Sequence, residues 1–384
     1  MKLQRAELKD YRNYTEECLC AGSGVNILLG PNAQGKTNLL EAVFYAALGR
    51  SHRTNADGEL IRWEAEDARM RFVFTRLGVE NELEFRIHRG RRREIGKNGH
   101  AVRMKDIIGS VCVVLFSPED LFLVKGAPAG RRRFLDMEIS QADASYFYDL
   151  AVYTRLLLQR NRLLKRVRDG AAQEEELSVW DVQLVPRAVA VMKKRLASVR
   201  RIGELADTAQ RELSAGGERL SASYEIFGLE GRDPMTTDLL SWYNDMLRES
   251  VKLDILRGST RFGPHRDDLL LSVNGADLRS YGSQGQQRTG ALALKLAELE
   301  FFREETGEYP ILLLDDVMSE LDGSRREKLL SFIRAKDIQT IVTATDEAYF
   351  PPDVPAAVYD VKGGRIRRRE QGHEGERDAA HAED

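Results

Sequence analysis

A glycine-rich stretch near the start of the chain, GPNAQGKT at residues 30–37, most constrains how this sequence can fold. An apolar run at 25–29 precedes it, and a helix-like run at 38–44 follows it. Strand, G-x-x-x-x-G-K-T and helix, in this order, form a loop whose backbone N–H groups surround phosphate oxygens at the positive end of a helix. The alternative is an accidental glycine turn. We favour nucleotide binding, although the loop alone does not distinguish kinases, GTPases, motors, transporters and chromosome ATPases.

The residue types in and after this loop have distinct chemical roles. Lys36 brings a cation to the β and γ phosphates of the nucleotide, and Thr37 offers a hydroxyl to Mg²⁺. The predicted nucleotide-binding residues of this segment are Gly30, Asn32, Gly35, Lys36, Thr37 and Asn38.

The overall composition indicates neither a membrane protein nor a strongly basic protein. The chain has 58 Lys and Arg against 61 Asp and Glu, a net charge of −3, so any contact with nucleic acid must come from local clusters. Three cysteines are too few for a disulfide framework or a zinc site. No apolar run reaches the roughly 18 residues of a membrane helix, and the first residues lack the apolar core of a signal peptide. We therefore expect a soluble cytoplasmic protein, near the nucleoid if it binds DNA.

A second element of an ATPase site stands near the other end of the chain. The apolar run 309–314 ends in Asp315 and Asp316. In nucleotide ATPases one carboxylate at the end of such a strand helps to hold Mg²⁺, and a second polarises the attacking water. Asp315 fits the first role and Asp316 the second; two aspartates that merely cap a strand are the alternative. Because Asp315 lies 279 positions after Lys36, a long insertion separates the two halves of the site.

Most of this insertion has helical periodicity. Apolar residues recur at three- and four-residue steps over 146–164 and again over 184–213, with a turn-like segment at 169–172. This pattern predicts an antiparallel helical hairpin with arms of about 30 residues, or ~45 Å each, which is shorter than a long coiled coil. The predicted organisation is an ATPase lobe at 1–117, a helical arm at 118–250, the second half of the ATPase lobe at 251–364 and a disordered tail at 365–384.

A third element lies upstream of the carboxylates, at YGSQGQQR (281–288), before an amphipathic helix. A hydroxyl, a glycine N–H and a helix N-terminus converge there, as in an anion-binding site. Since the chain has one phosphate loop, we interpret this segment as binding the γ-phosphate of ATP held by a second copy. An ordinary helix capped by Ser283 is the alternative. The residues concerned are Ser283, Gln284, Gly285 and Gln286.

Together, GPNAQGKT, YGSQGQQR, LLLDD and SELD (319–322) resemble the ABC-type ATPase heads of SMC-like chromosome-maintenance proteins. Among these heads the chain is most similar to the RecF family of bacterial recombination mediators. Further matching stretches lie at 9–14, 49–53, 116–121, 131–136 and 263–268, and the resemblance extends to about residue 365. It implies an α/β fold, an ABC-type P-loop ATPase head with a mixed β-sheet flanked by helices and an inserted, mainly helical arm.

The resemblance also implies roles for single residues. By this resemblance the catalytic residues are Lys36, Asp315 and Asp316. The cofactors are ATP and Mg²⁺, and Thr37 and Asp315 are the expected metal ligands. Residues 283–286 become the signature motif acting on a second copy, and Ser319 and Asp322 belong to a D-loop across the dimer. Three departures indicate slow hydrolysis: Asp316 is shorter than the usual glutamate, 343–346 lacks a histidine, and Glu119 lies where a glutamine is usual.

At the level of function, the resemblance implies an ATP-dependent homodimer that grips double-stranded DNA at junctions with single strands, and a weak, DNA-stimulated ATPase. The implied partners are RecR and RecO, which help to load RecA. The implied processes are DNA recombination, repair, replication and the SOS response. Runs of cations in a sequence more often form a helix face that points to solvent. The family resemblance favours contacts with DNA phosphates instead. The main candidates are Arg131, Arg132, Arg133, Lys165, Arg166, Lys193 and Lys194, with Arg160, Arg162, Arg168, Arg195, Arg200 and Arg201 as further arm cations.

Three other functions remain open. An ABC transporter ATPase would share both phosphate-binding motifs but would need a membrane partner. An SMC-like chromosome tether would need long coiled arms. A metabolite kinase is the weakest alternative because the sequence contains no evident acceptor site.

Overall fold

A six-stranded, mainly parallel sheet carries the phosphate loop in the computed structural model, which describes residues 1–351 and 354–369. Five neighbouring strands run parallel, and β15 joins the edge antiparallel to β14. The strands at 25–29, 113–116, 311–315 and 340–344 are mainly apolar and buried, as expected for the part of a sheet that is covered on both faces. In spatial order they are β15 (Arg365–Arg368), β14 (Ala356–Lys362), β3 (Val25–Leu29), β13 (Thr340–Ala344), β12 (Ile311–Asp315) and β8 (Val113–Phe116).

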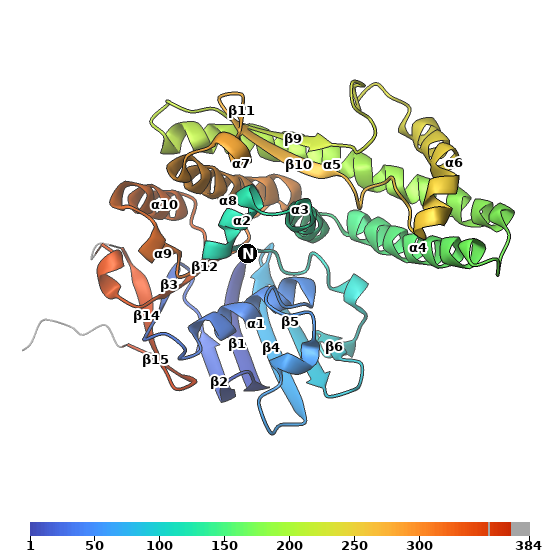
Figure 1. Ribbon diagram of the computed structural model, residues 1–384. Helices are drawn as coiled ribbons and strands as arrows, with labels where there is room; N and C mark the ends of the chain where they lie inside the picture. Colours follow the sequence, from blue (N-terminus) through green and yellow to red (C-terminus); the bar gives the residue numbers. More distant parts are fainter. Residues whose placement is uncertain (352–353, 370–384) are drawn as a thin grey trace, which may run out of the picture.

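A second, antiparallel sheet lies beside it in the lower lobe (Figure 1). Its strands alternate between buried apolar and solvated polar side chains, which marks a sheet with one face on the core. Helix α1 (Lys36–Leu48) is buried along most of its length and contacts strands of both sheets. The order is β2 (Tyr14–Cys20), β1 (Lys2–Tyr11), β4 (Asp67–Arg76), β5 (Val79–His88), β6 (Glu94–Lys97) and β7 (His100–Ala101).

The predicted helical hairpin is confirmed and forms the upper part of the molecule (Figure 1). Its helices, α4 (Ala144–Arg168) and α5 (Leu177–Leu213), have 25 and 37 residues, hence lengths of about 38 and 55 Å. Contacts of Asp149 with Arg187 and of Arg160 with Asp181 establish the antiparallel arrangement. The remaining arm elements are α2 (Leu121–Lys125), α3 (Pro128–Ala142), α6 (Leu239–Arg257) and a small sheet of β9 (Leu220–Glu225), β10 (Asp268–Val273) and β11 (Ala276–Asp277).

The arm extends further along the sequence than predicted. Helix α6 continues past residue 250, the predicted boundary, and β10 pairs with β9. This pairing joins strands separated by more than forty residues, so it leaves no local sequence signal. At the C-terminus, β15 is ordered where the disordered tail was predicted to begin, and residues 370–384 of that predicted tail lie outside the described residues.

One buried helix links the two parts. Helix α8 (Gln284–Thr306) packs against α5 of the arm and against β8 of the parallel sheet. Among residues 1–351 and 354–369, no helix is both long and apolar enough to span a membrane. The last short elements are α7 (Leu278–Tyr281), α9 (Val317–Glu320), α10 (Gly323–Ala335) and five 3₁₀ turns: η1 (Asp57–Leu60), η2 (Met104–Asp106), η3 (Pro118–Asp120), η4 (Glu174–Glu176) and η5 (Glu347–Tyr349).

Candidate functional site

The glycine-rich loop joins the end of β3 to the start of α1, and its glycines are required by close packing. A Cβ atom at Gly30 would lie 2.3 Å from the carbonyl oxygen of Val361. Gly35 has a φ of 118°, and a Cβ there would lie 2.9 Å from the hydroxyl of Tyr14, which donates to the Gly35 carbonyl at 2.8 Å. The neighbouring β-strands therefore fix the path of the loop, and only glycine suits these two positions.

Lys36, the first residue of α1, folds back over the loop. Its ammonium group donates to the carbonyl oxygens of Gly30 and Pro31. Burial lowers the pKa of Lys36, while the charges of Asp316 and Asp315 act in the opposite direction. A buried cation without a carboxylate in direct contact favours an added anion.

The carboxylate of Asp315 contacts the loop across the sheet. Strand β13 lies between β3 and β12, so the carboxyl ends of all three strands meet at one edge. There Asp315 Oδ1 accepts hydrogen bonds from the hydroxyls of Thr37 and Thr343, both at 2.9 Å. The two halves of the predicted site, 278 residues apart in sequence between Thr37 and Asp315, therefore meet in the folded chain.

Asp316 turns away from its strand in an unusual backbone conformation. Its φ is 54° in the left-handed region, and its N–H donates to the hydroxyl of Thr343 at 2.8 Å. Non-glycine residues held in this region cost about 1–3 kcal/mol and occur preferentially at functional sites. Asp316 lines the same pocket as Lys36 and Thr37, a cavity of about 470 Å³.

The donor atoms at this edge suit Mg²⁺. A threonine hydroxyl and a carboxylate oxygen are hard donors, and Mg²⁺ sites commonly use one or two such protein groups together with waters and phosphates. Within the described ranges there is no cluster of three or more His, Cys, Asp or Glu that could hold a metal ion. A metal here would therefore depend on Thr37, Asp315 and the phosphates of a nucleotide.

Arg53 also lines the pocket, although sequence analysis assigned it no role. Its guanidinium donates to Asn38 Oδ1 at 2.8 Å, and Asn38 in turn donates to Asn13 at 2.8 Å. The side chain is exposed on its remaining side. The stretches at 9–14 and 49–53, which carried part of the family resemblance, therefore both lie at the phosphate loop. Because both stretches carry the resemblance, the sequence could have indicated a second cation beside the phosphate loop.

The predicted signature segment forms the exposed start of α8. The hydroxyl of Ser283 accepts from the Gln286 N–H at 3.2 Å, and Gln286 Oε1 accepts from the Ser283 N–H at 2.9 Å, which completes a capping box. Ser283, Gln284 and Gly285 are exposed. None of these described residues lines the pocket around Lys36. The helix-cap alternative is thus present in the structure, and it leaves this helix N-terminus open to a ligand.

The predicted D-loop is bound to the signature helix within one chain. Asp322 caps α10 by accepting the Arg325 N–H at 2.9 Å, and it forms an ion pair with the Arg325 guanidinium. The same guanidinium donates to the Thr289 hydroxyl at 2.7 Å. Ser319 is exposed and donates to the carbonyl of Asp316 at 2.8 Å.

Several candidate DNA-binding arginines lie inside the arm, and this corrects the sequence-based set. Arg131 forms a two-point ion pair with Asp268, at 2.8 and 2.6 Å, and only 5% of its side chain is exposed. Arg160 is fully buried between Asp181 and Asp254, and Arg195 is 2% exposed beside Asp136. Local charge runs do not reveal that these arginines pair with distant carboxylates.

The other candidates divide into bound and exposed side chains. Arg132 and Lys194 are half-buried; Arg132 donates to the carbonyl of Asp267 at 2.9 Å, and Lys194 pairs with Asp143. Arg133, Lys165, Arg166 and Lys193 are exposed, as are the further arm cations Arg162, Arg168, Arg200 and Arg201. Of these, Arg168, Arg200 and Arg201 each pair with a carboxylate.

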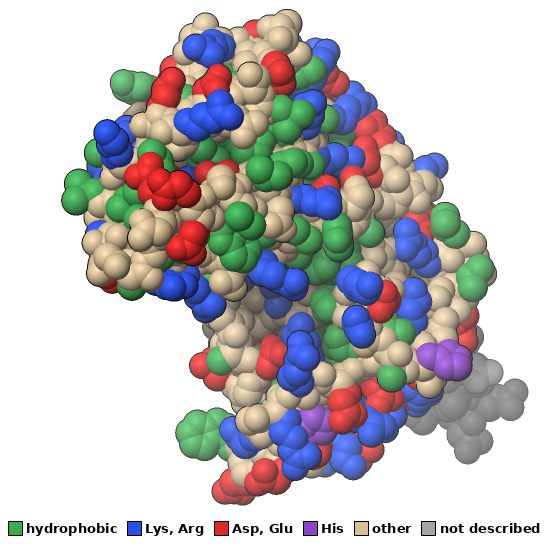
Figure 2. Space-filling model, turned by 90° about the vertical axis from the view of Figure 1, so that its right-hand side faces the viewer, with side chains coloured by type: hydrophobic (Ala, Val, Ile, Leu, Met, Phe, Trp, Pro, Cys, Tyr) green, Lys and Arg blue, Asp and Glu red, His purple; other side chains and the backbone are tan. Residues whose placement is uncertain are grey.

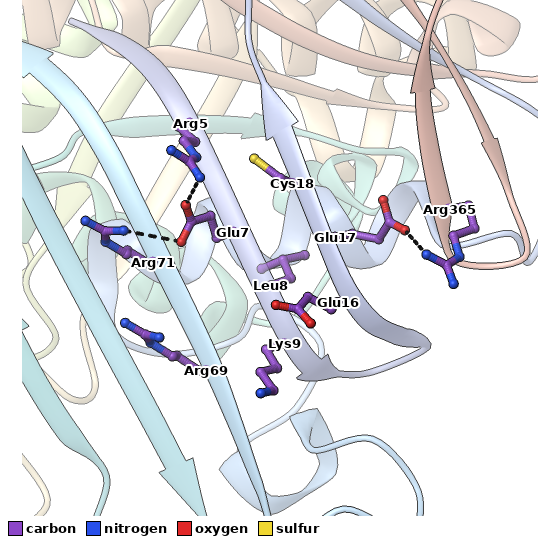
Figure 3. Close-up of a pocket in the computed structure, with 10 residues that line it drawn as sticks. All are labelled: Arg5, Glu7, Leu8, Lys9, Glu16, Glu17, Cys18, Arg69, Arg71 and Arg365. Atoms are coloured by element: carbon purple, nitrogen blue, oxygen red, sulfur yellow. Dashed lines mark hydrogen bonds and ion pairs between the residues drawn. The ribbon is translucent and has the colours of Figure 1, made fainter.

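A second pocket, of about 530 Å³, lies on the outer face of the antiparallel sheet and is also lined by charges (Figure 3). Glu7 lies between Arg5 and Arg71 and forms ion pairs with both, while Glu17 pairs with Arg365. Two further carboxylates beside the pocket, Glu84 and Glu82, pair with Arg69 and Arg71. The pocket therefore provides little net charge for an anion.

Comparison with known proteins identifies close relatives. The family model described as the RecF/RecN/SMC N-terminal domain matches residues 2–364. A protein of Halalkalibacterium halodurans named DNA replication and repair protein RecF is 42% identical over 372 residues, which is 96% of this chain and 100% of that protein. A protein of Heliobacterium modesticaldum with the same name is 43% identical over 375 residues, 96% of this chain and 99% of its own.

Solved structures agree with this result. The recombination mediator protein RecF with ATP, from the RecFOR pathway, is 34% identical and superposes with a TM-score of 0.88 over 96% of this chain and 98% of that one. The Smc head domain of Pyrococcus furiosus, solved with an extended coiled coil, is 16% identical and has a TM-score of 0.54 over 96% of both chains. The second likeness concerns the fold alone, and it agrees with the predicted ATPase-head architecture.

Proposed function

The chain belongs to the RecF family of DNA replication and repair proteins, and we propose that it is an ATP-dependent DNA-binding protein of recombinational repair and replication. The observation that carries the proposal is the contact of Thr37 with Asp315, which joins the phosphate loop to the acidic strand end. ATP binds at residues 30–38 in this proposal. Thr37 and Asp315 would hold Mg²⁺, which would supply positive charge to offset that of the phosphates.

Two copies then close face to face on two nucleotides. The exposed N-terminus of α8, with Ser283 and Gly285, binds the γ-phosphate of ATP held by the other copy. To shift an equilibrium from mostly open to mostly closed takes about 5.5 kcal/mol of differential binding. Two sets of charge-assisted hydrogen bonds, which ATP can accept and ADP cannot, can supply a free energy of this size.

Slow hydrolysis reopens the dimer. Asp316 orients the attacking water, and its side chain is one methylene shorter than the glutamate usual at this position. Hydrolysis removes the γ-phosphate contacts and with them the stabilisation of the closed form. The chain acts as a weak, DNA-stimulated ATPase in which ATP times the release of DNA.

The closed dimer holds duplex DNA beside single-stranded gaps. Phosphate contacts carry the affinity, so binding does not depend on sequence and weakens with added salt. In this proposal the chain works with RecR and RecO to load RecA at the gap. The RecFOR pathway named for the ATP-bound relative supports this context.

Sedimentation velocity with a gapped duplex tests the proposal. With ATP and Mg²⁺, an Asp316→Asn variant should accumulate as a DNA-bound dimer, because binding is retained while hydrolysis is blocked. A Lys36→Ala variant is the matched control and should stay monomeric. A monomeric, DNA-free Asp316→Asn variant at saturating ATP would refute the proposal.

A further inference from the structure

Three segments that are distant in sequence carry exposed cations on one side of the molecule, and together we call them the lateral strip. They are the β5–β6 turn (89–93), the short turn η2 and the exposed face of α4 between 155 and 165. Arg93 of the first turn donates to the carbonyl of Gly49 at the end of α1. A Cβ atom at Gly49 would collide with Met104 of η2, and η2 packs against α4.

The lobe part of the strip is strongly basic for a chain of net charge −3. Residues 88–106 contain seven Lys and Arg side chains against two acidic ones, Glu94 and Asp106. Arg89, Arg93 and Lys97 are bound to groups of the chain itself. Arg91 and Arg92 at the tip of the turn, and Lys105 in η2, are exposed.

The arm part of the strip follows one face of α4. Arg155 and Arg162 are seven residues apart, so they lie on the same side of the helix, about 10 Å from each other. Lys165 continues this exposed face one turn further. Figure 2, which looks at this side of the molecule, has Lys and Arg side chains on both sides of the hollow between the arm and the lower lobe.

The six exposed cations of the strip have no partner among the described residues, a property that they share with some other exposed cations such as Lys193 and Arg288. Within the described residues, the side chains of Arg91, Arg92, Lys105, Arg155, Arg162 and Lys165 make no hydrogen bond or ion pair. By contrast, Arg200, Arg211 and Arg219 on the far part of the arm are paired with Glu204 or Asp207. Unpaired like charges repel each other, and an external anion relieves this repulsion.

The surroundings of these cations favour a polyanion over a protein partner. A protein interface normally has a buried apolar centre with a polar rim. Residues 88–106, all of them described, expose no large apolar side chain, and 155–165 expose only Leu158. A DNA backbone presents phosphates at regular intervals, and exposed cations are sufficient to bind them.

We propose that the lateral strip contacts the phosphate backbone of duplex DNA, with Arg91, Arg92 and Lys105 on the lobe and Arg155, Arg162 and Lys165 on the arm. This inference rests on the proposed function, since it assigns the surface by which the dimer holds DNA. It replaces the buried Arg131, Arg160 and Arg195 of the sequence-based set. In this proposal one duplex touches both segments, so contacts on the lobe and on the arm strengthen each other.

Fluorescence anisotropy with a labelled 30-base-pair duplex tests this surface, using the full chain with ATP and Mg²⁺ at several salt concentrations. Two variants remove the strip in parts: R91Q/R92Q/K105Q on the lobe and R155Q/R162Q/K165Q on the arm. The control variant R200Q/R211Q/R219Q removes the same charge from paired arginines. Each strip variant should lose at least about tenfold in affinity near 0.1 M salt, and its salt slope should fall by about 0.9 for each lost phosphate contact. Melting temperature and ATP binding should not change.

The outcomes separate this inference from the proposed function. If the unmodified chain fails to bind duplex DNA with ATP, the proposed function fails and the strip assignment with it. If the unmodified chain binds while both strip variants bind as tightly, the strip assignment alone is overturned and an acidic protein becomes its partner. A control variant that loses as much affinity as the strip variants would also overturn the assignment, because net charge would then explain the effect.

Discussion

Replacement of Arg131 by alanine is expected to destabilise the arm without weakening DNA binding. Arg131 on α3 donates to both carboxylate oxygens of Asp268 on β10, at 2.8 and 2.6 Å, and to the carbonyl of Gly126 at 2.8 Å. The two charged side chains are 5% and 14% exposed. The pair therefore joins α3 to the small sheet of the arm, with both side chains largely buried.

The expected loss follows from the partner that remains. Without Arg131, the Asp268 carboxylate stays largely buried and unpaired, and removal of one member of such a pair costs about 3–5 kcal/mol. For a folding unit of the size of the arm, each kcal/mol lowers the melting temperature by about 2–4 °C. We therefore expect the arm transition to fall by about 6–20 °C. A R131M/D268N variant should recover part of this loss, because it leaves no uncompensated charge.

Scanning calorimetry on the full chain measures the transition, and duplex binding by anisotropy is measured well below it. Arg133→Ala is the matched control from the same arginine triplet. Its guanidinium makes only long contacts, 3.4 and 3.5 Å, with the carbonyls of Ser51 and His52, so its loss should cost less than about 1 kcal/mol. If Arg131→Ala melts like the unmodified chain yet binds DNA more weakly, the ion-pair argument is wrong and Arg131 is a DNA contact.

Three further predictions concern the nucleotide site, the dimer and the buried charges. Asp315→Asn should weaken Mg²⁺-dependent ATP binding by at least about tenfold, because it replaces a carboxylate that would bind the metal beside Thr37. Titration of Mg²⁺ with a fluorescent ATP analogue measures this effect, and an unchanged Mg²⁺ midpoint would contradict the prediction. Ser283→Arg should abolish ATP-dependent dimers in sedimentation while monomeric ATP binding persists, and loss of both would mean that the motif is misassigned. Burial raises the pKa of Glu138 to about 7, so the folded chain holds a proton there that the unfolded chain releases near pH 4.5, and stability falls as pH rises from about 4.5 to about 7. Glu138→Gln should therefore flatten the decline in melting temperature between pH 5 and 8, and an equally steep decline would contradict this assignment.

The geometry of the candidate nucleotide site was largely predictable because its signals are local. The loop, the apolar strands and the carboxylates each occupy a few consecutive residues, and parallel strands bring their carboxyl ends to one edge. The meeting of Thr37 with Asp315 across 278 residues followed from that rule. Arg53 was missed since its contact with Asn38 depends on the path of a loop that has no periodic pattern.

The surface chemistry was less predictable. A cation run in a sequence does not state whether its members face water or a carboxylate, and the pairs Arg131–Asp268 and Arg160–Asp254 span 137 and 94 residues. The turn at 89–93 has no local pattern that predicts a ligand contact, although Arg89, Arg91 and Arg92 are exposed. Pairing, and not local charge density, separates structural arginines from those available to a ligand. Pairing is a property of the tertiary fold.

The link between the predicted signature helix and the predicted D-loop affects how experiments on the proposed dimer can be interpreted. The Thr289 hydroxyl donates to the Gly285 carbonyl at 2.8 Å and accepts from Arg325, while Arg325 is also bound to Asp322. Charge-assisted contacts of this kind hold both motifs of one copy in a fixed relation. A substitution at Arg325 would therefore disturb both motifs, and its effect could not be assigned to either. Ser283 is exposed and bonds only within its own helix cap, so a change there tests the contact with a second copy while Arg325 keeps the D-loop in position.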